Sequence, residues 1–288
     1  MNTQGSCTLV GAGPGDPELL TLKAVRAIQR ATVLFVDDLV GPDIVALAAP
    51  GARIVRVGKR GGCKSTPQAF IEKLMATAVR EGHRVVRLKG GDPFIFGRGG
   101  EEVEHLRAEG IAVTVVNGIT SGLAALTTLG APLTHRDHAH GVVFITGHAQ
   151  PGDTGVDWAQ LAATAHAARL TLVIYMGVRG VDAIQHGLLQ GLPAATPVAV
   201  VQNASLPAQR HAVATLGSLG AAIAAHGLAS PAIIVVGDVV RGVAAAGAPA
   251  HGLNHRAAQT PTSPAATSSS PQRSRAASFS PNSRRETA

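Results

Sequence analysis

The sequence predicts an α/β protein with two domains, because short apolar segments alternate with helical patterns along most of its length. The apolar runs are four to six residues long, and helix-type periodicity separates most of them. Glycine-rich turns follow several of these runs. With 288 residues, of which 45% are hydrophobic, the chain is large enough to build two separate cores.

The first series of segments predicts a mostly parallel sheet that is covered by helices on both faces. One helix is expected to begin with Asp16 as its cap and Pro17 at its first position. A second is expected to begin near Pro67 and to end at Gly82. The strands of this series are predicted at residues 8–10, 33–36, 53–57, 84–88 and 111–116.

A second series follows, with fewer glycine-rich turns between its elements. We therefore expect an N-terminal domain over residues 1–118 and a C-terminal domain over residues 119–243. Residues 244–288 are rich in Ala, Ser, Pro, Thr and Arg, which predicts a disordered basic tail. Strands of the second series are predicted at 141–146, 170–175, 197–201, 212–216 and 232–236, with a helix at 218–226.

Charge and cysteine content exclude several classes of function. The formal net charge is +7, but the tail holds five arginines and one acid, so the remaining chain carries only about +3. A general nucleic-acid binder is therefore not indicated. Cys7 and Cys63 match no metal spacing and are expected to be free thiols. The sequence predicts neither a membrane span nor a secretion signal, so a cytoplasmic location is expected.

The most informative segment is LKGGDPFIFGRGGE at residues 88–101. A predicted strand ends here in Gly90-Gly91-Asp92, where the absence of two Cβ atoms lets a ligand approach the backbone. Asp92 can accept hydrogen bonds from ligand hydroxyls or amines, and Pro93 fixes the following turn. This pattern predicts a strand whose carboxyl end binds a small molecule.

Ligands of open α/β sheets bind outside the carboxyl ends of the strands, which share one edge. A glycine-lined floor, a carboxylate, a lysine and two hydroxyls are expected there, a set that suits an adenosyl ligand and acid–base chemistry. Asp37 and Lys59 are the candidate acid–base pair, although each alone is also typical of an ordinary surface charge. The turns concerned are residues 11–16, 37–38, 58–60, 90–92 and 117–121.

The turn at residues 11–16 is similar to a dinucleotide fingerprint, with Asp37 about 20 residues further on as a ribose-binding acid would be. However, Asp16 stands where the last glycine belongs, and Pro14 removes a backbone donor for a pyrophosphate. Nicotinamide or flavin binding is therefore disfavoured. A tight strand-to-helix turn without a ligand remains an alternative for this loop.

Two further groups of polar residues have competing interpretations. His135, His138, His140 and His148 cluster in sequence, but no carboxylate or cysteine pattern completes a metal site, so no metal is predicted. Arg98 and Arg136 fall in loops that flank the predicted edge. Surface charge is their default interpretation, and recognition of an acidic ligand is the sharper one.

Eight segments carry a family resemblance: GAGPGDPELLTLKA, VGKR, RLKGGDPFIFGRGGEE, GITSG, PLTHRD, TGH, YMGV and PAIIVVGDVV. Together they resemble the tetrapyrrole methylase family, and within it the uroporphyrinogen-III C-methyltransferases, over residues 6 to 241. This resemblance implies a homodimer of two α/β domains, with S-adenosylmethionine in the cleft between the domains. It implies methylation of uroporphyrinogen III at two pyrrole carbons, C2 and C7, which gives precorrin-2 for sirohaem or cobalamin synthesis. The alternatives are another precorrin methyltransferase and a dinucleotide-binding oxidoreductase.

The resemblance also implies roles for individual residues. Asp37 matches the proton acceptor and Lys59 the proton donor, and Arg98 and Arg136 are candidates to orient the eight carboxylates of the substrate. Val36, Asn117 and Ala204 depart from the residues usual in the family at these positions. The positions that match cofactor contacts are Pro14, Gly90, Gly91, Asp92, Ile95, Thr120, Ser121, Met176 and Ala204.

Overall fold

A computed structural model describes residues 5–58, 67–148, 152 and 154–245 of the chain. It contains two five-stranded sheets with helices between the strands, which confirms the predicted α/β class with two series of elements. Lys59, Cys63 and almost all of the predicted tail lie outside the described residues. Both sheets belong to the same compact unit of the chain.

The first sheet has the strand order β3-β2-β4-β1-β5, and all four of its strand pairs are parallel. Because the strands are parallel, their carboxyl ends lie at one edge, as the sequence predicts. The central strands are buried on both faces, as is typical of parallel sheets. The strands are β1 (Ser6–Gly11), β2 (Val33–Val36), β3 (Arg53–Arg56), β4 (Arg84–Lys89) and β5 (Val113–Val116).

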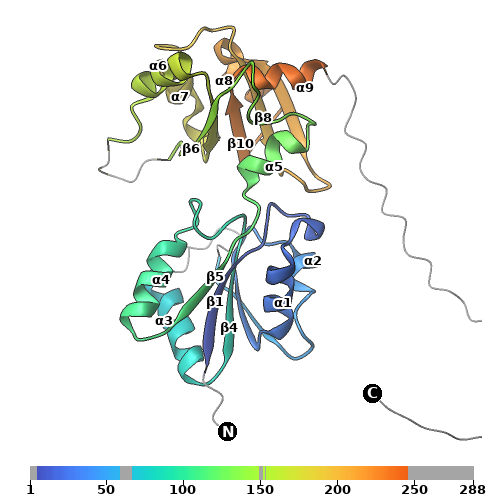
Figure 1. The fold of residues 1–288 in the computed structure, drawn as a ribbon, viewed down its shortest axis with the longest axis vertical. Helices are drawn as coiled ribbons and strands as arrows, with labels where there is room; N and C mark the ends of the chain where they lie inside the picture. The colour runs from blue at the N-terminus through green and yellow to red at the C-terminus, as the bar shows by residue number, and fades with distance from the viewer. Residues whose placement is uncertain (1–4, 59–66, 149–151, 153, 246–288) are drawn as a thin grey trace, which may run out of the picture. The chain divides into compact units, whose positions relative to one another are not determined.

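Helices cover both faces of this sheet, as Figure 1 shows. On one side, α1 (Leu22–Arg30) and α2 (Pro42–Val45) pack against one apolar cluster. On the other, α3 (Gln68–Arg80) and α4 (Gly99–Ala108) pack against a second cluster. Cys7 belongs to that second cluster, and burial raises the pKa of its thiol to about 12, so it behaves as a core residue.

The prediction of one continuous helix from Pro17 is wrong, because the chain forms two separate helical segments there. Asp16 does cap a helical turn, accepting a hydrogen bond from the Glu18 N–H at 2.8 Å, but this 3-10 turn spans only Pro17–Leu19. The backbone of Leu20 is then extended, and the Thr21 hydroxyl caps α1 by accepting from the Ala24 N–H. The second cap restarts the chain as a separate helix.

The second sheet is mixed, with the strand order β6-β7-β10-β8-β9. Only β6 and β7 pair in parallel, whereas β10 runs antiparallel to both β7 and β8. The carboxyl ends of β6, β7 and β8 therefore lie at the same edge. The strands are β6 (Gly141–Thr146), β7 (Leu170–Tyr175), β8 (Pro197–Gln202), β9 (Arg210–Thr215) and β10 (Ala232–Val236).

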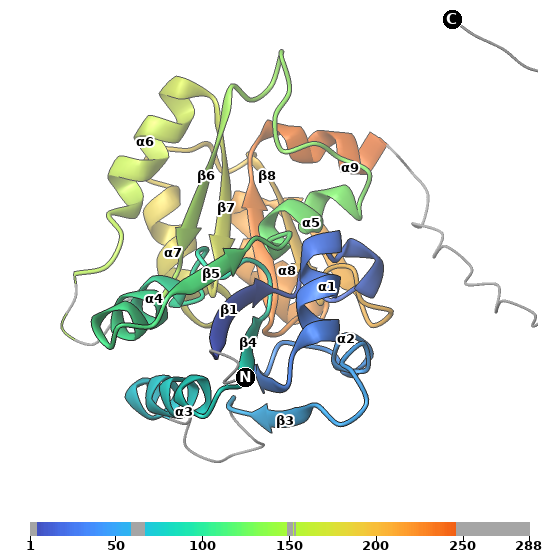
Figure 2. The same ribbon diagram turned by 60° about the horizontal axis from the view of Figure 1, so that its bottom comes forward.

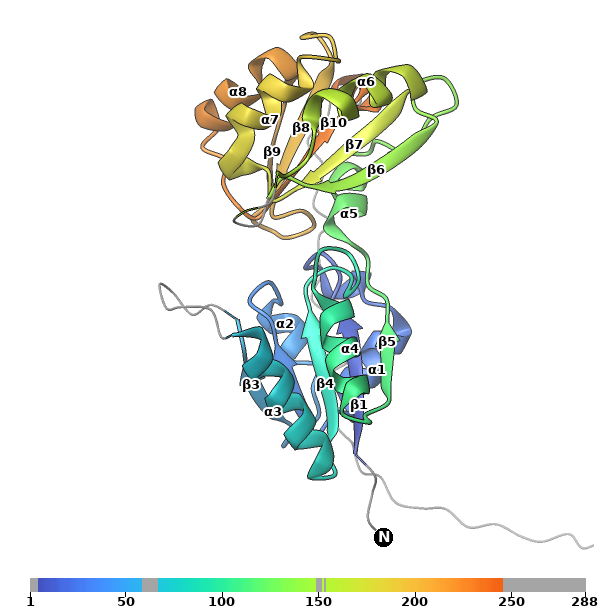
Figure 3. The ribbon, with the colours of Figure 1, turned by 90° about the vertical axis from the view of Figure 1, so that its left-hand side faces the viewer.

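Two apolar clusters lie on the two faces of the second sheet. One packs the sheet against α6 (Trp158–Ala168), α7 (Val181–Leu188) and α8 (Leu219–Ala225). The other packs it against α5 (Ser121–Thr127). Figure 3 shows α5 and the group α6, α7 and α8 on opposite faces. The short α9 (Arg241–Ala245), labelled in Figure 2, contributes Val243 to the same cluster as α5.

The predicted domain boundary near Asn117-Gly118 stays a prediction. The first sheet ends with β5 at Val116, and the second begins with β6 at Gly141, with α5 between them.

Among the described residues, no helix combines the length and the apolar character that crossing a bilayer requires.

Candidate active site

Three turns from different strands meet at the carboxyl edge of the first sheet. The turns after β1 and β4 are joined by two backbone hydrogen bonds, from Gly13 N–H to Gly91 O at 3.2 Å and from Gly91 N–H to Gly13 O at 2.7 Å. A Cβ atom on Gly118, after β5, would lie 2.2 Å from the carbonyl oxygen of Gly91 and 2.8 Å from the backbone of Gly11. Gly11 and Gly118 are required because backbone packs directly on backbone there, whereas Gly13 and Gly91 adopt left-handed backbones (φ 68° and 67°) that strain other residues.

Asp92 joins two of these turns. One carboxylate oxygen accepts a hydrogen bond from the Phe94 N–H at 2.8 Å, which shapes the turn after β4. The other accepts from the Asn117 side-chain amide and the Gly118 N–H, both at 3.1 Å. Asp92 is buried, and these three donors are all neutral, so its negative charge is held at the edge without being cancelled by them.

Asp37 follows β2 at the same edge, and 36% of its side chain is exposed. Its backbone N–H donates to Leu88 O at 3.0 Å, which fixes the residue beside the end of β4. One carboxylate oxygen accepts from the Asp38 N–H, and the other lies 3.5 Å from a guanidinium nitrogen of Arg87. The carboxylate is therefore held beside a cation and remains accessible to a ligand.

A buried cluster of charges lies behind Asp37, and the sequence interpretation missed it. The Arg87 side chain donates from Nε to Glu102 Oε1 at 2.9 Å. Lys89 Nζ lies 3.2 Å from the same oxygen and 3.1 Å from Oε2. All three side chains are almost completely buried, and Gln68 also donates to Glu102 Oε1 at 3.0 Å.

The signal for this cluster is visible in the sequence. Arg87 and Lys89 alternate with apolar residues in a strand of a parallel sheet, whose side chains are buried on both faces. Buried cations require an anion, which Glu102 supplies from α4. Burial lowers the pKa of Lys89, and the nearby Arg87 lowers it further, while Glu102 and Asp37 act in the opposite direction.

At the second sheet, Tyr175 connects several predicted cofactor contacts. Its hydroxyl lies 2.7 Å from the Thr120 hydroxyl and accepts from the Gly122 N–H at 2.8 Å. Met176 follows it directly, with a left-handed backbone (φ 56°) and a half-exposed side chain. Ala204, after β8, is buried in the same apolar cluster as Tyr175, and its neighbour Ser205 accepts from the Asp16 N–H at 3.2 Å.

The structure therefore brings most of the predicted cofactor residues to strand ends. Pro14, Gly90, Gly91 and Asp92 lie on turns at the carboxyl edge of the first sheet, and Thr120 and Ser121 follow β5 at the start of α5. Met176 and Ala204 lie at the carboxyl edge of the second sheet. Ile95, in the turn after β4, packs against the apolar cluster that contains Tyr175.

The two predicted substrate arginines are placed differently. Arg98 directly precedes α4 in the turn after β4, and its exposed guanidinium donates to Glu101 at 3.0 and 3.1 Å, which lowers the pKa of Glu101. Arg136 precedes β6, so the structure places it at the opposite edge of the second sheet from Met176 and Ala204. It is not brought together with the other predicted residues.

The histidines near Arg136 form a turn rather than a metal centre. His135 pairs with Ala139 through two backbone hydrogen bonds, and its ring stacks on that of His138. Within the described part of the chain, no group of three or more His, Cys, Asp or Glu residues is placed to hold a metal ion.

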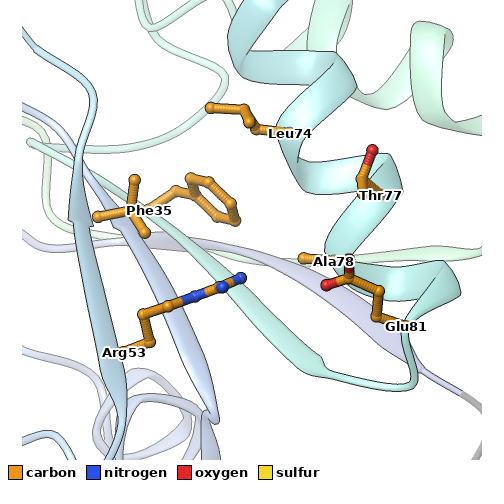
Figure 4. A pocket seen from close by; sticks show the side chains of 7 residues that line it. Phe35, Arg53, Leu74, Thr77, Ala78 and Glu81 are labelled. Carbon is orange, nitrogen blue, oxygen red and sulfur yellow. The ribbon is translucent and has the colours of Figure 1, made fainter.

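A separate cavity of about 270 Å³ lies between β2, β3 and α3 (Figure 4). Its lining is mostly apolar but includes the charged residues Arg53 and Glu81, and none of the predicted site residues lines it. The predicted proton donor Lys59 lies outside the described residues. Gly58, which precedes it, packs so closely on Asp38 that a Cβ atom would lie 2.6 Å from the Asp38 nitrogen.

Comparisons with known proteins agree with this arrangement. Residues 6–220 match the family model for tetrapyrrole (corrin/porphyrin) methylases. The chain is 53% identical over 240 residues to a uroporphyrinogen-III C-methyltransferase of Pseudomonas aeruginosa, covering 83% of this chain and 96% of that protein. It is 50% identical over 240 residues to siroheme synthase 2 of Aeromonas hydrophila, covering 83% of this chain but only half of that longer protein.

A solved structure of the same kind of enzyme also matches this chain in sequence and fold. Uroporphyrin-III C-methyltransferase from Thermus thermophilus, complexed with S-adenyl homocysteine, is 42% identical to this chain and superposes with a TM-score of 0.70. The match covers 82% of this chain and 94% of that structure. Given these matches and the shared arrangement of two α/β sheets, the chain belongs to the tetrapyrrole (corrin/porphyrin) methylase family.

Proposed function

We propose that this protein transfers methyl groups from S-adenosylmethionine to C2 and C7 of uroporphyrinogen III and so forms precorrin-2. The observation that carries the proposal is the meeting of three glycine turns beside Asp37 and Asp92 at one sheet edge. The name of the Pseudomonas aeruginosa relative and the ligand in the Thermus thermophilus structure support it. The family likeness disfavours the dinucleotide oxidoreductase.

The residues present fit an adenosyl cofactor. Backbone-on-backbone packing at Gly11, Gly91 and Gly118 leaves a floor without side chains, against which a flat or extended ligand can lie. Asp92 holds a buried negative charge that complements a cationic amino-acid ligand. When bound, S-adenosylmethionine supplies a methyl group on a positively charged sulfur, already activated towards a carbon nucleophile. The residues proposed to hold the cofactor are the nine positions predicted from the sequence: Pro14, Gly90, Gly91, Asp92, Ile95, Thr120, Ser121, Met176 and Ala204.

The chain's own contribution is to hold the substrate in place, exclude water and remove a proton. Positioning of this kind contributes up to about 7–11 kcal/mol in favourable cases. Attack by a pyrrole carbon on the methyl group leaves the tetrapyrrole as a cation, which must then shed a proton from elsewhere in the ring system. Asp37 is the candidate acceptor of that proton because its carboxylate is accessible. Arg87, 3.5 Å away, orients that carboxylate. Lys59 remains the proposed proton donor.

We propose the location, oligomeric state and domain limits of the protein from the same family likeness. We expect a cytoplasmic homodimer whose product enters sirohaem or cobalamin synthesis, with no nucleic acid and no membrane as partner. The domain limits of 1–118 and 119–243, followed by a disordered tail, are part of this proposal. Arg98 is proposed to contact substrate carboxylates, and Arg136 can do so only from the other edge of its sheet.

The experiment that tests the function measures S-adenosylhomocysteine binding by calorimetry and precorrin-2 formation from enzymatically generated uroporphyrinogen III. An Asp37→Asn variant is expected to lower kcat by about 10²–10⁴-fold, because general bases contribute about that much. Its affinity for S-adenosylhomocysteine should stay unchanged. Asp43→Asn, an exposed acid at the start of α2, is the matched control and should keep full activity. Absence of ligand binding by the unaltered protein would overturn the proposed function.

Arg98 and Glu101 provide a second prediction, on substrate recognition. Arg98→Gln should raise KM for uroporphyrinogen III by about ten- to a hundredfold, because it removes a charge-assisted contact worth about 1.5–3 kcal/mol. Glu101→Gln should instead lower KM, since it releases Arg98 from the ion pair. Neither change should affect binding of S-adenosylhomocysteine. Equal KM values in both variants would exclude Arg98 from substrate binding.

A further inference from the structure

Tyr175 occupies a point where three segments of the candidate site meet. It is the last residue of β7, and it directly precedes Met176. Its hydroxyl contacts Thr120 and Gly122 at the start of α5. Its ring lies against Phe96 of the turn after β4, with ring centroids 4.8 Å apart. Neither the sequence motifs nor the proposed mechanism assigns this side chain a role.

The contact with α5 is close enough to fix the residue type on both sides. A Cβ atom on Gly122 would lie 2.2 Å from the Tyr175 hydroxyl oxygen and 2.8 Å from a side-chain carbon of Val173. The phenol can reach the Gly122 N–H only because position 122 has no side chain. The Thr120-Ser121 turn is therefore held against the end of β7 by the tyrosine hydroxyl.

The hydroxyl pair also has hydrogen-bonding capacity left over. Tyr175 and Thr120 carry two hydroxyl protons, and the single bond between them uses one. Both residues are buried, so the second proton requires an acceptor other than bulk water, which is either the nearby Ser121 side chain or a bound ligand. An adenosyl ligand offers several acceptors, in its ribose, its adenine and its carboxylate.

The aromatic contact stabilises an unfavourable backbone. Phe96 has a φ of 52°, in the left-handed region that a non-glycine residue adopts at a cost of about 1–2 kcal/mol. An aromatic pair contributes about 0.5–1.5 kcal/mol beyond its buried area, which offsets part of this cost. The ring of Tyr175 therefore holds the turn after β4, while its hydroxyl holds the turn after β5.

We propose that Tyr175 is a positioning residue for the adenosyl ligand, holding the Thr120-Ser121 turn through its hydroxyl and Phe96 through its ring. This inference rests on the proposed function, because it names a further residue of the same site. It predicts that loss of the hydroxyl weakens cofactor binding without changing the affinity for the tetrapyrrole.

The first test compares Tyr175→Phe with the unaltered protein. The variant keeps the ring contacts but leaves the Gly122 N–H without its acceptor, and its Kd for S-adenosylhomocysteine should rise about tenfold. KM for uroporphyrinogen III should not change. Phe144→Leu is the control, because Phe144 packs edge-on against the same ring and its substitution leaves the Tyr175 hydroxyl in place. It should bind S-adenosylhomocysteine as tightly as the unaltered protein.

The second test needs no variant, because Tyr175 is the only tyrosine in the chain. Burial raises the pKa of Tyr175 above 10.0, so in a pH titration the tyrosinate absorbance band should appear at a higher pH in the folded protein than in the unfolded protein. Since the neutral phenol is favoured in the folded state, stability should be retained below pH 10 and lost as the pH rises through the folded pKa. Bound S-adenosylhomocysteine should move the tyrosinate transition to still higher pH.

These outcomes separate the inference from the function on which it rests. If the unaltered protein binds S-adenosylhomocysteine, while Tyr175→Phe binds it equally well, the positioning role is overturned and the methyltransferase stands. An unchanged tyrosinate transition in the presence of bound ligand overturns it in the same way. If the unaltered protein binds no S-adenosylhomocysteine, the proposed function fails, and this inference fails with it.

Discussion

Gly118→Ala is expected to abolish S-adenosylhomocysteine binding and to lower the free energy of unfolding by about 3 kcal/mol or more, at the upper end for overpacking. The added Cβ atom would lie 2.2 Å from the Gly91 carbonyl oxygen and 2.8 Å from Gly11 backbone atoms. These are backbone atoms, so no side chain can rotate away to make room. The turns after β1, β4 and β5 would have to separate, and the floor of the proposed cofactor site would separate with them.

Gly100→Ala is the matched control for this variant. Gly100 lies in the first turn of α4 with no other atom within 4 Å of its Cβ position, and its backbone is helical. The same chemical change should therefore stabilise the protein slightly, by up to about 1 kcal/mol. Chemical denaturation followed by circular dichroism, with calorimetry at low temperature for the binding, compares the two variants. Normal binding by a folded Gly118→Ala protein would contradict the idea that these three turns form one floor.

The position of this floor could be predicted from the sequence because its cause is local. Glycine-rich turns directly after apolar runs indicate strand ends, and parallel strands bring their carboxyl ends to one edge. The same reasoning located Asp37, since an acid directly after a buried strand has few other places to lie. Strand bounds at β2, β6, β7 and β10 agree with the expected ones, since each is a short run of apolar residues with clear limits.

Other features depend on contacts that a single sequence does not reveal. Glu101 and Glu102 are adjacent acids in the same helix, yet one pairs with Arg98 at the surface and the other is buried beneath Arg87 and Lys89. Only the orientation of α4 on the sheet decides which is which. Tyr175 was missed for a similar reason, because its partners Thr120 and Gly122 are more than 50 residues away. The antiparallel direction of β9 and β10 likewise has no local signal.

Glu102→Ala is expected to lower the free energy of unfolding by about 3–5 kcal/mol, the usual effect of removing one partner from a buried ion pair. Arg87 and Lys89 would remain buried without their shared carboxylate. The neighbouring variant Glu101→Ala is the control. That side chain is 53% exposed, and its pair with Arg98 should contribute no more than about 1 kcal/mol. Urea denaturation of both variants measures the difference, and similar losses of stability would contradict the proposed burial of Glu102.

The same variant should reduce catalysis through Arg87 rather than through the cofactor. Arg87 is held between Glu102 and Asp37, so loss of Glu102 leaves its guanidinium free to turn towards the remaining carboxylate. Asp37 would then be bound more tightly to Arg87, and its carboxylate would be less free to reach the substrate. We expect kcat to fall while Kd for S-adenosylhomocysteine stays constant. A change confined to Kd would assign the buried cluster to cofactor binding instead.

The stability deficit of Glu102→Ala should also depend on pH, with a sign that the cluster dictates. Lys89 already has a pKa below 10.5 because it is buried, and Glu102 is a group that counteracts this shift. Removing Glu102 lowers the pKa of Lys89 further, so the folded variant binds fewer protons than the unfolded chain over a wider range below pH 10.5. Stability rises with pH wherever the unfolded state binds more protons. The deficit should therefore shrink between neutral pH and about pH 10, because a neutral Lys89 no longer needs a carboxylate partner. A deficit that stays constant over this range would mean that Lys89 keeps its charge by another route, and that Glu102 is not the group that sustains it.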